Sequence, residues 1–471
     1  MRATINQKSN DKIYWYIPLI VFICSLAFET FLGNTLFYYS YNSIRGVQDF
    51  LNENLGISIF NNSYAPNKTE PNKNSSYISF LNKENIEHFV KGFDGNILFS
   101  EIVHFLNTNT FFLVLCAITY NFVNIYKISV LIYSIFISNF ISSTLCFIFH
   151  APRPYMAYYS IKPVIMFNEW GSPNTQLAVL IAFSLSFYEV VIKDTQIINS
   201  LVGKISSFCV IGFILLLDTF LLFASGNIAY NQIIFSICIG VVTYQIIFLI
   251  FKVEIKKSRQ LYGFLKFRMG YYISINAILL SFQLILNYFI IDKSDEDYYT
   301  KNIVEQQSRL FYSSFLNDNF NYRMLFYLNK GNFCNVICFT MNIIALVALK
   351  LELYYTYDRN YETWSLNNFE KLSFDREDPL INSTQDSEDF VVRERTQWNH
   401  TGIIRTIIRL IVIIILCFCC MVPSLLVYYL IDSTTINGYI FIVTVPMVLI
   451  VFGMFYLFKV FLKLIKLVNL N

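Results

Sequence analysis

The residues with the clearest chemical meaning lie at the ends of two consecutive apolar segments. Arg153-Pro154 follows one apolar segment, and Gly171-Ser172-Pro173-Asn174 opens the next. The planar guanidinium group of arginine can bind two phosphate oxygens at once. Phosphoryl transfer also needs a nucleophile that attacks phosphorus and an acid that protonates the leaving group. The placement of Arg153 therefore indicates a phosphate-binding position where two membrane helices meet.

A third polar segment, residues 225–232, joins two further apolar segments. Together the three segments resemble the motifs of the type 2 phosphatidic acid phosphatase superfamily, which includes lipid phosphate phosphatases and glucose-6-phosphatases. The resemblance covers about residues 13–251 and implies a six-helix core. In that family two arginines and a lysine hold the phosphate. One histidine is the nucleophile, and a second histidine protonates the leaving group.

Most of the positions that the resemblance assigns to chemistry carry other residues here. The lysine position holds Cys146, the acid position Gln176, the second arginine position Leu222 and the nucleophile position Ile228. Isoleucine cannot attack phosphorus, and glutamine cannot donate a proton near neutral pH. No catalytic residue of the family is retained, so the chain is expected to be a pseudophosphatase.

Three residues remain as candidates for binding a phosphate: Arg153, Ser172 and the nearby His150. We expect Arg153, Ser172, Gln176 and Ile228 to line one pocket on the luminal side of the membrane. The possible ligand is a phosphorylated lipid headgroup. His150 also leaves open an active hydrolase with displaced residues.

The composition is that of a membrane protein. Of 471 residues, 55% are apolar and 14% are charged, whereas a soluble protein carries about a quarter charged residues. The net charge of +3 is too weak to favour nucleic-acid binding. We expect membrane lipids as partners, and the sequence predicts no cofactor and no metal site, because its histidines are scattered.

About 20 apolar residues cross a bilayer core as a helix. On that measure the chain is an all-α, polytopic bundle with about ten spans: 13–32, 105–124, 127–149, 174–193, 205–224, 231–251, 270–291, 332–350, 403–430 and 438–459. The predicted organisation is a six-span core at 1–251 with a luminal loop at 33–104. Two further spans at 252–350, a flexible cytoplasmic loop at 351–402 and a two-span hairpin at 403–471 follow.

Lysine and arginine concentrate on the side that carries both termini, which predicts a cytoplasmic N-terminus and a cytoplasmic C-terminus. Loop 33–104 then faces the lumen or the exterior. It carries glycosylation sequons at Asn61, Asn67 and Asn74. The expected location is an endomembrane or the plasma membrane.

One ionisable residue, Asp218, lies within the fifth predicted span, flanked by leucines. Such a residue marks either a polar contact between helices or a polar pathway. A multispanning transporter or channel is therefore the third reading of the sequence, beside the pseudophosphatase and the active hydrolase.

Overall fold

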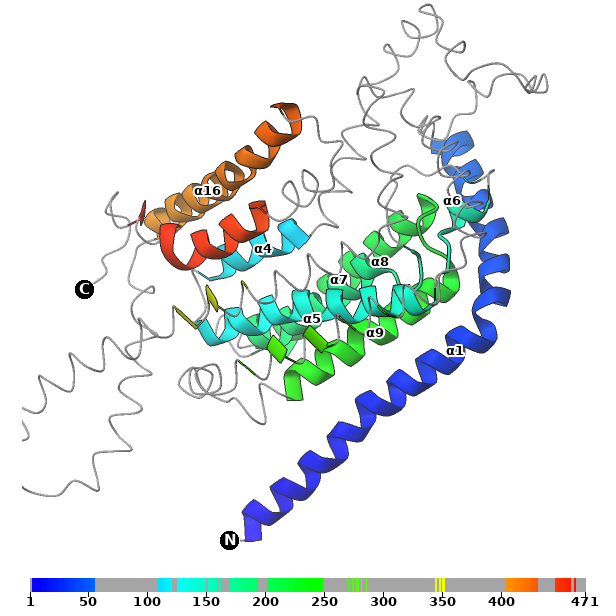
Figure 1. Ribbon diagram of the computed structural model, residues 1–471, viewed down its shortest axis with the longest axis horizontal. Helices are drawn as coiled ribbons and strands as arrows, with labels where there is room; N and C mark the ends of the chain where they lie inside the picture. Colours follow the sequence, from blue (N-terminus) through cyan, green and yellow to red (C-terminus); the bar gives the residue numbers. More distant parts are fainter. Residues whose placement is uncertain are drawn as a thin grey trace, which may run out of the picture.

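The protein, described here from a computed structural model, is built from α-helices (Figure 1). The structure describes residues 2–55, 109–120, 125–149, 151–158, 161, 170–193, 201–249, 403–430, 445–458 and 461–462, with single residues between 270 and 351. No strand occurs among these residues, in agreement with the predicted all-α class.

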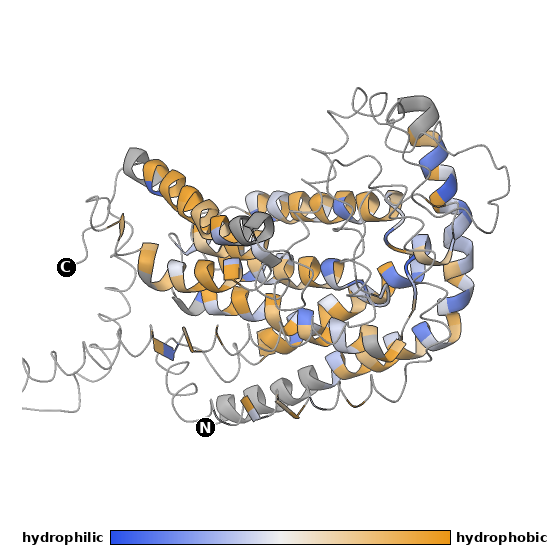
Figure 2. Ribbon diagram, turned by 45° about the horizontal axis from the view of Figure 1, so that its top comes forward, coloured by the Kyte–Doolittle hydropathy of each residue, from blue (hydrophilic) through white to orange (hydrophobic). Residues whose placement is uncertain are grey.

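Five helical stretches are long and apolar enough to cross a membrane: Tyr16–Leu51, Lys127–Cys146, Thr175–Ile192, Leu201–Ala224 and Tyr230–Leu249. Most of the helical ribbon that Figure 2 colours is apolar. The chain is therefore an integral membrane protein. Shorter apolar helical stretches fall within three other predicted spans, at Thr110–Thr119, Ile407–Pro423 and Val445–Phe455. Most of the spans predicted at 270–291 and 332–350 lies outside the described residues.

The described elements follow the predicted segments closely in most cases. They are α1 (Arg2–Leu55), α4 (Asn109–Thr119), α5 (Ile125–Phe149), α6 (Pro154–Ala157), α7 (Thr175–Phe187), the π-helical turn η3 (Tyr188–Lys193), α8 (Leu201–Ala224), α9 (Tyr230–Leu249), α16 (Ile403–Leu430) and the π-helical turn η6 (Gly453–Leu457).

Helix α1 is longer than the span predicted at 13–32. It continues to Leu55, so residues 33–55, which the sequence analysis placed in the luminal loop, are helical. The physical reason is that apolar and aromatic residues continue through residues 34–51, which contain no proline that would end the helix. Buried residues of α1 recur at helical spacing along one face: Ser25, Glu29, Ser40, Ile44 and Gln48.

Helices α1, α5, α7, α8 and α9 form a group that we call the first bundle. Helix α9 lies at its centre, where it packs against α1, α5 and α7 (Figure 1). Helices α7 and α9 approach each other closely at Gly240, where an added Cβ would lie 2.8 Å from the carbonyl oxygen of Ala178. Small residues at such crossings let membrane helices approach each other closely. Helix α8 is different, because large apolar side chains such as Phe213 and Leu216 are exposed along it. In a membrane this surface of α8 faces lipid or another helix.

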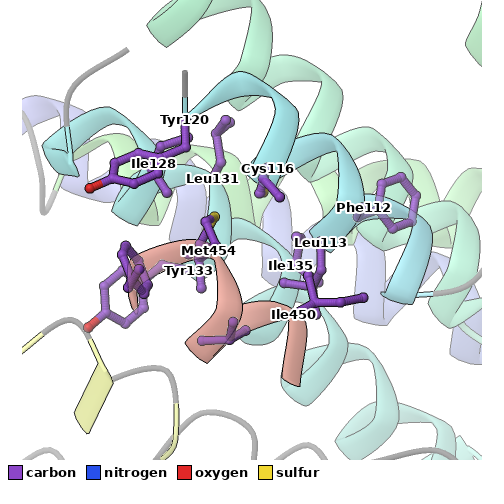
Figure 3. Packing of buried hydrophobic residues seen from close by; sticks show 14 of the residues in the cluster. Phe112, Leu113, Cys116, Tyr120, Ile128, Leu131, Tyr133, Ile135, Ile450 and Met454 are labelled. Carbon is purple, nitrogen blue, oxygen red and sulfur yellow. The ribbon is translucent and has the colours of Figure 1, made fainter. Parts of the chain in front are cut away.

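A second apolar core joins α4, α5 and the helical stretch around η6 (Figure 3). Phe112, Leu113 and Cys116 of α4 lie in one buried cluster with Ile450 and Met454. Helix α16 packs against α4 on the same side of the molecule. This core connects the C-terminal helices to the first bundle without involving the three polar motif segments.

Candidate functional site

Three loop segments that are distant in the sequence meet at one end of the first bundle. We call residues 151–156, 170–176 and 225–232 the loop junction. The backbone NH of Gly171 donates to the carbonyl of Ala151 at 2.8 Å, and the NH of Tyr155 donates to the carbonyl of Gly226 at 3.4 Å. The ends of α5 and α8 and the starts of α7 and α9 are thereby held together.

Arg153 contacts both of the other segments. Its side chain is fully buried, with 0% exposure. Nη1 donates to the carbonyl of Asn227 at 3.1 Å, and Nη2 donates to Oε1 of Gln176 at 3.5 Å. The structure therefore brings Arg153 together with the acid position and with the residue that precedes the nucleophile position.

The nucleophile position itself is apolar and closed. Ile228 is 0% exposed and lies in one buried apolar cluster with Leu222, Tyr155 and Met156. The side chain of Leu222 cannot bind a phosphate as arginine does, and the side chain of Ile228 cannot attack phosphorus. The contacts at these two residues are apolar packing contacts. The pocket that the sequence predicts here stays a prediction.

Gln232, at the start of α9, ties the junction to the helices. Its Oε1 accepts from the NH of Ala229 at 3.1 Å, and its Nε2 donates to the carbonyl of Pro152 at 2.7 Å. A Cβ added to Gly171 would overlap the Gln232 side-chain amide, so glycine is needed at this close approach. The amide of Gln232 thus has a structural function in joining all three segments.

The start of α7 is capped by its own motif residue. Oδ1 of Asn174 accepts from the NH of Leu177 at 2.9 Å, which satisfies one of the free NH groups of the first turn. The NH of Asn174 donates to Oγ of Ser236 on α9 at 2.7 Å. Cys146, which stands at the lysine position, donates its thiol to the carbonyl of Pro173 at 2.8 Å. These contacts fix the loop before α7 without using a charged group.

Helix α1 supplies a functional group that the sequence analysis missed. The hydroxyl of Ser172 donates to Oε1 of Glu29, and Nδ2 of Asn231 donates to the same oxygen at 2.9 Å. Further along the same face of α1, Oγ of Ser40 accepts from the NH of Tyr230 at 2.8 Å. Nε2 of Gln48 donates to the carbonyl of Ala224 at 2.9 Å. The available signal was an acidic residue within an apolar run, which is a functional hypothesis by default.

An aromatic cluster covers α1 beside the junction. The ring of Tyr158 lies 4.4 Å from that of Tyr41 and 5.8 Å from that of Phe37, measured between ring centroids. Burial, and then the neighbouring Tyr38 and Tyr41 hydroxyls, raise the pKa of Tyr158. The phenol of Tyr158 therefore stays neutral and cannot serve as an anionic nucleophile near neutral pH.

Of the remaining predicted residues, the structure describes only Asp218. Asp218 lies in α8 and is half-buried. His150 and the sequon residues Asn61, Asn67 and Asn74 lie outside the described residues. Within the described part of the chain, no group of three His, Cys, Asp or Glu side chains could hold a metal ion.

The junction can therefore hold helices together and present one buried carboxyl group, but it offers no nucleophile at position 228 and no acid at position 176. Comparison with models of protein families, with curated proteins and with solved structures finds no match to this chain.

Proposed function

We propose that this membrane protein is a non-catalytic relative of the type 2 phosphatidic acid phosphatases, with a six-span core inside a bundle of about ten spans. In this proposal the motif segments serve as a scaffold that joins the core helices. Membrane lipids are its partners, and Arg153 acts as a structural residue of the scaffold.

The observation that carries the proposal is the state of Arg153 and Ile228. A phosphate-binding arginine must offer its NH groups to the substrate, whereas Arg153 is fully buried and donates to Asn227 and Gln176. A phosphatase of this family needs a nucleophile at position 228, and the residue there is a fully buried isoleucine. Arg153 is retained but makes contacts that stabilise the fold, and Ile228 replaces the nucleophile with a buried apolar side chain.

The proposal predicts no phosphomonoesterase activity. Purified full-length protein, reconstituted with lipid, should release no more phosphate than a mock purification from phosphatidic acid, sphingoid phosphate or sugar phosphate. The physical reason is that in-line attack needs a nucleophile opposite the leaving group, and loss of one such catalytic group alone lowers the rate by about a hundredfold or more. Phosphate release is measured with each substrate over a range of pH values.

The matched variant for this assay is His150→Ala. Turnover that disappears in His150→Ala would contradict the proposal and support a hydrolase with displaced residues. Turnover that is equal in both proteins and follows the protein through every purification step would show a site elsewhere in the chain. Solute or ion flux in proteoliposomes that is lost in Asp218→Asn would instead support a transporter or channel.

The proposed topology predicts N-glycosylation within residues 56–104, the part of the predicted luminal segment that follows α1. Treatment with a glycosidase should increase the gel mobility of the protein, and the shift should disappear when Asn61, Asn67 and Asn74 are all replaced by Gln. Asn382 provides the matched control, because the sequence places it in the cytoplasmic loop 351–402. A mobility shift that depends on Asn382 would reverse the proposed orientation.

A further inference from the structure

A single carboxyl oxygen joins three parts of the bundle. Oε1 of Glu29 on α1 accepts from the hydroxyl of Ser172 before α7 and from Nδ2 of Asn231 on α9. Glu29 is 7% exposed, Ser172 is 0% exposed and Asn231 is 2% exposed, so the group is shielded from water. Glu29 also lies within the apolar helical stretch Tyr16–Leu51, so its carboxyl group is surrounded mostly by apolar residues of α1.

The other oxygens of this cluster are acceptors that lack a donor. Oε2 of Glu29 and Oδ1 of Asn231 are buried and have no hydrogen-bond partner among the described residues. A buried carboxylate is costly unless it is paired with a cation, and a buried acceptor without a donor adds a further cost. The cluster as described therefore has one negative charge and two acceptors in excess.

The charged and titratable groups on the packed elements do not balance this charge. Those with described side chains are Lys127, Tyr133 and Cys146 on α5, Arg153 and Tyr155 at α6, Tyr188 and Glu189 on η3, Lys204, Cys209 and Asp218 on α8, and Tyr230, Cys238 and Tyr244 on α9. Lys127 and Lys204 lie near the starts of α5 and α8, roughly 30 Å along each helix from the ends that form the junction. Arg153 donates to Asn227 and Gln176. On α1 itself, Arg45 is exposed and pairs with Asp49 at 3.8 Å.

We propose that Glu29, Ser172 and Asn231 form a buried proton-binding site inside the helical bundle. The bound proton comes from water, forms an O–H bond at Oε2 of Glu29 and neutralises the carboxylate. The protonated Oε2 then donates to Oδ1 of Asn231, while Oε1 continues to accept from Nδ2 of the same amide. One proton thus removes the charge and satisfies both of the acceptors that lack a donor.

The space around Glu29 fits this arrangement. Gly33 lies one helical turn further along α1, and a Cβ added there would lie 3.3 Å from Cδ of Glu29. The carboxyl group therefore lies over the glycine, where no side chain separates it from the neighbouring segments. With the proton bound, the site clamps α1 to the loop before α7 and to α9. This inference is independent of whether the junction hydrolyses phosphate.

The test is the dependence of thermal unfolding on pH for the full-length protein in detergent, with choline chloride as the salt. In the proposal the folded protein keeps a proton on Glu29 that the unfolded chain releases above the usual pKa of glutamate. The stability of the folded protein should therefore fall as the pH rises above that pKa. The folding equilibrium constant should fall by up to about tenfold per pH unit. Glu29→Gln carries a permanent donor in place of the protonated oxygen. It should be as stable as the wild type at low pH and should lose this pH dependence. Asp49→Asn, an exposed acidic residue of the same helix, should keep the wild-type dependence.

Infrared difference spectroscopy gives a readout that a merely structural contact would not change. The C=O stretching band of a buried protonated carboxyl group should be present in the wild type near neutral pH and absent in Glu29→Gln. Two results together would overturn the proposal. They are a Glu29→Gln protein that is less stable than the wild type at every pH, and a wild type that shows no such band. Stabilisation of the wild type by Na⁺ but not by choline would also overturn it, because the cation that binds would then be a metal ion.

Discussion

Replacing Arg153 with alanine should lower the thermal stability of the protein more than any other single truncation at the loop junction. Arg153 is fully buried and donates to Asn227 and Gln176. Hydrogen bonds from a charged donor contribute about 1.5–3 kcal/mol each, and the buried aliphatic part of the side chain adds packing. We therefore expect a loss of about 3 kcal/mol or more, measured as the shift of the unfolding midpoint in detergent.

Two control variants separate this effect from a general effect of charge. Arg45→Ala removes an exposed arginine whose side chain is 59% exposed, and it should change stability by about 0.5 kcal/mol or less. Arg153→Lys keeps the charge but not the planar fork, and its stability should lie between those of Arg153→Ala and the wild type. Stabilisation of the wild type by added inorganic phosphate, lost in Arg153→Lys, would contradict the structural role and show that Arg153 still binds an anion.

The sequence predicts the helices of the first bundle well, because each is an apolar run of membrane length. The span predicted at 127–149 corresponds to α5 (Ile125–Phe149), and the span at 231–251 corresponds to α9 (Tyr230–Leu249). Hydropathy measures the transfer of each residue into lipid, so it detects these helices without knowing their neighbours. It does not detect where α1 ends, because aromatic residues such as Tyr38 and Tyr39 belong equally to a membrane interface and to a loop.

The contacts of the junction could be predicted only in part. Motif spacing placed Arg153 near residues 176 and 228, and the structure shows its contacts to Gln176 and to Asn227. The role of Glu29 could not be predicted, because its partners Ser172 and Asn231 lie 143 and 202 residues away in the sequence. No periodicity within one helix encodes such a contact. An isolated acidic residue in an apolar run shows that a partner is needed, but not which residue it is.

The polar contacts of α1 also bear on how the core is held together. Apolar packing alone discriminates poorly between arrangements of membrane helices, because lipid tails are as apolar as the side chains that they replace. On α1, Glu29 bonds to Ser172 in the loop before α7. Ser40 bonds to the start of α9 at Tyr230, and Gln48 bonds to the end of α8 at Ala224. These bonds fix the rotation of α1 about its own axis. The motif segments can therefore act as a scaffold although their catalytic groups are absent.

Two glycines in the middle of membrane helices should respond to alanine in opposite directions. In Gly240→Ala the new Cβ would lie 2.8 Å from the backbone carbonyl of Ala178 and 2.8 Å from Cβ of Ile181, so α7 and α9 must move apart. Such overpacking costs about 1–3 kcal/mol. In Gly212→Ala on α8, nothing lies within 4 Å of the new Cβ. Alanine is favoured over glycine inside a helix by about 1 kcal/mol, so Gly212→Ala should stabilise the protein.

The comparison of these two variants tests the packing of α7 on α9 directly. Both change the same residue type in the same way, so their difference in unfolding midpoint reports the close approach and not the helical preference of alanine. Gly240→Ala should also weaken the junction, because the same α7–α9 contact brings Asn174 to Ser236. Equal midpoints for the two variants would mean that α9 does not cross α7 at Gly240, and the positions of Ser172 and Asn231 around Glu29 would then have to be reconsidered.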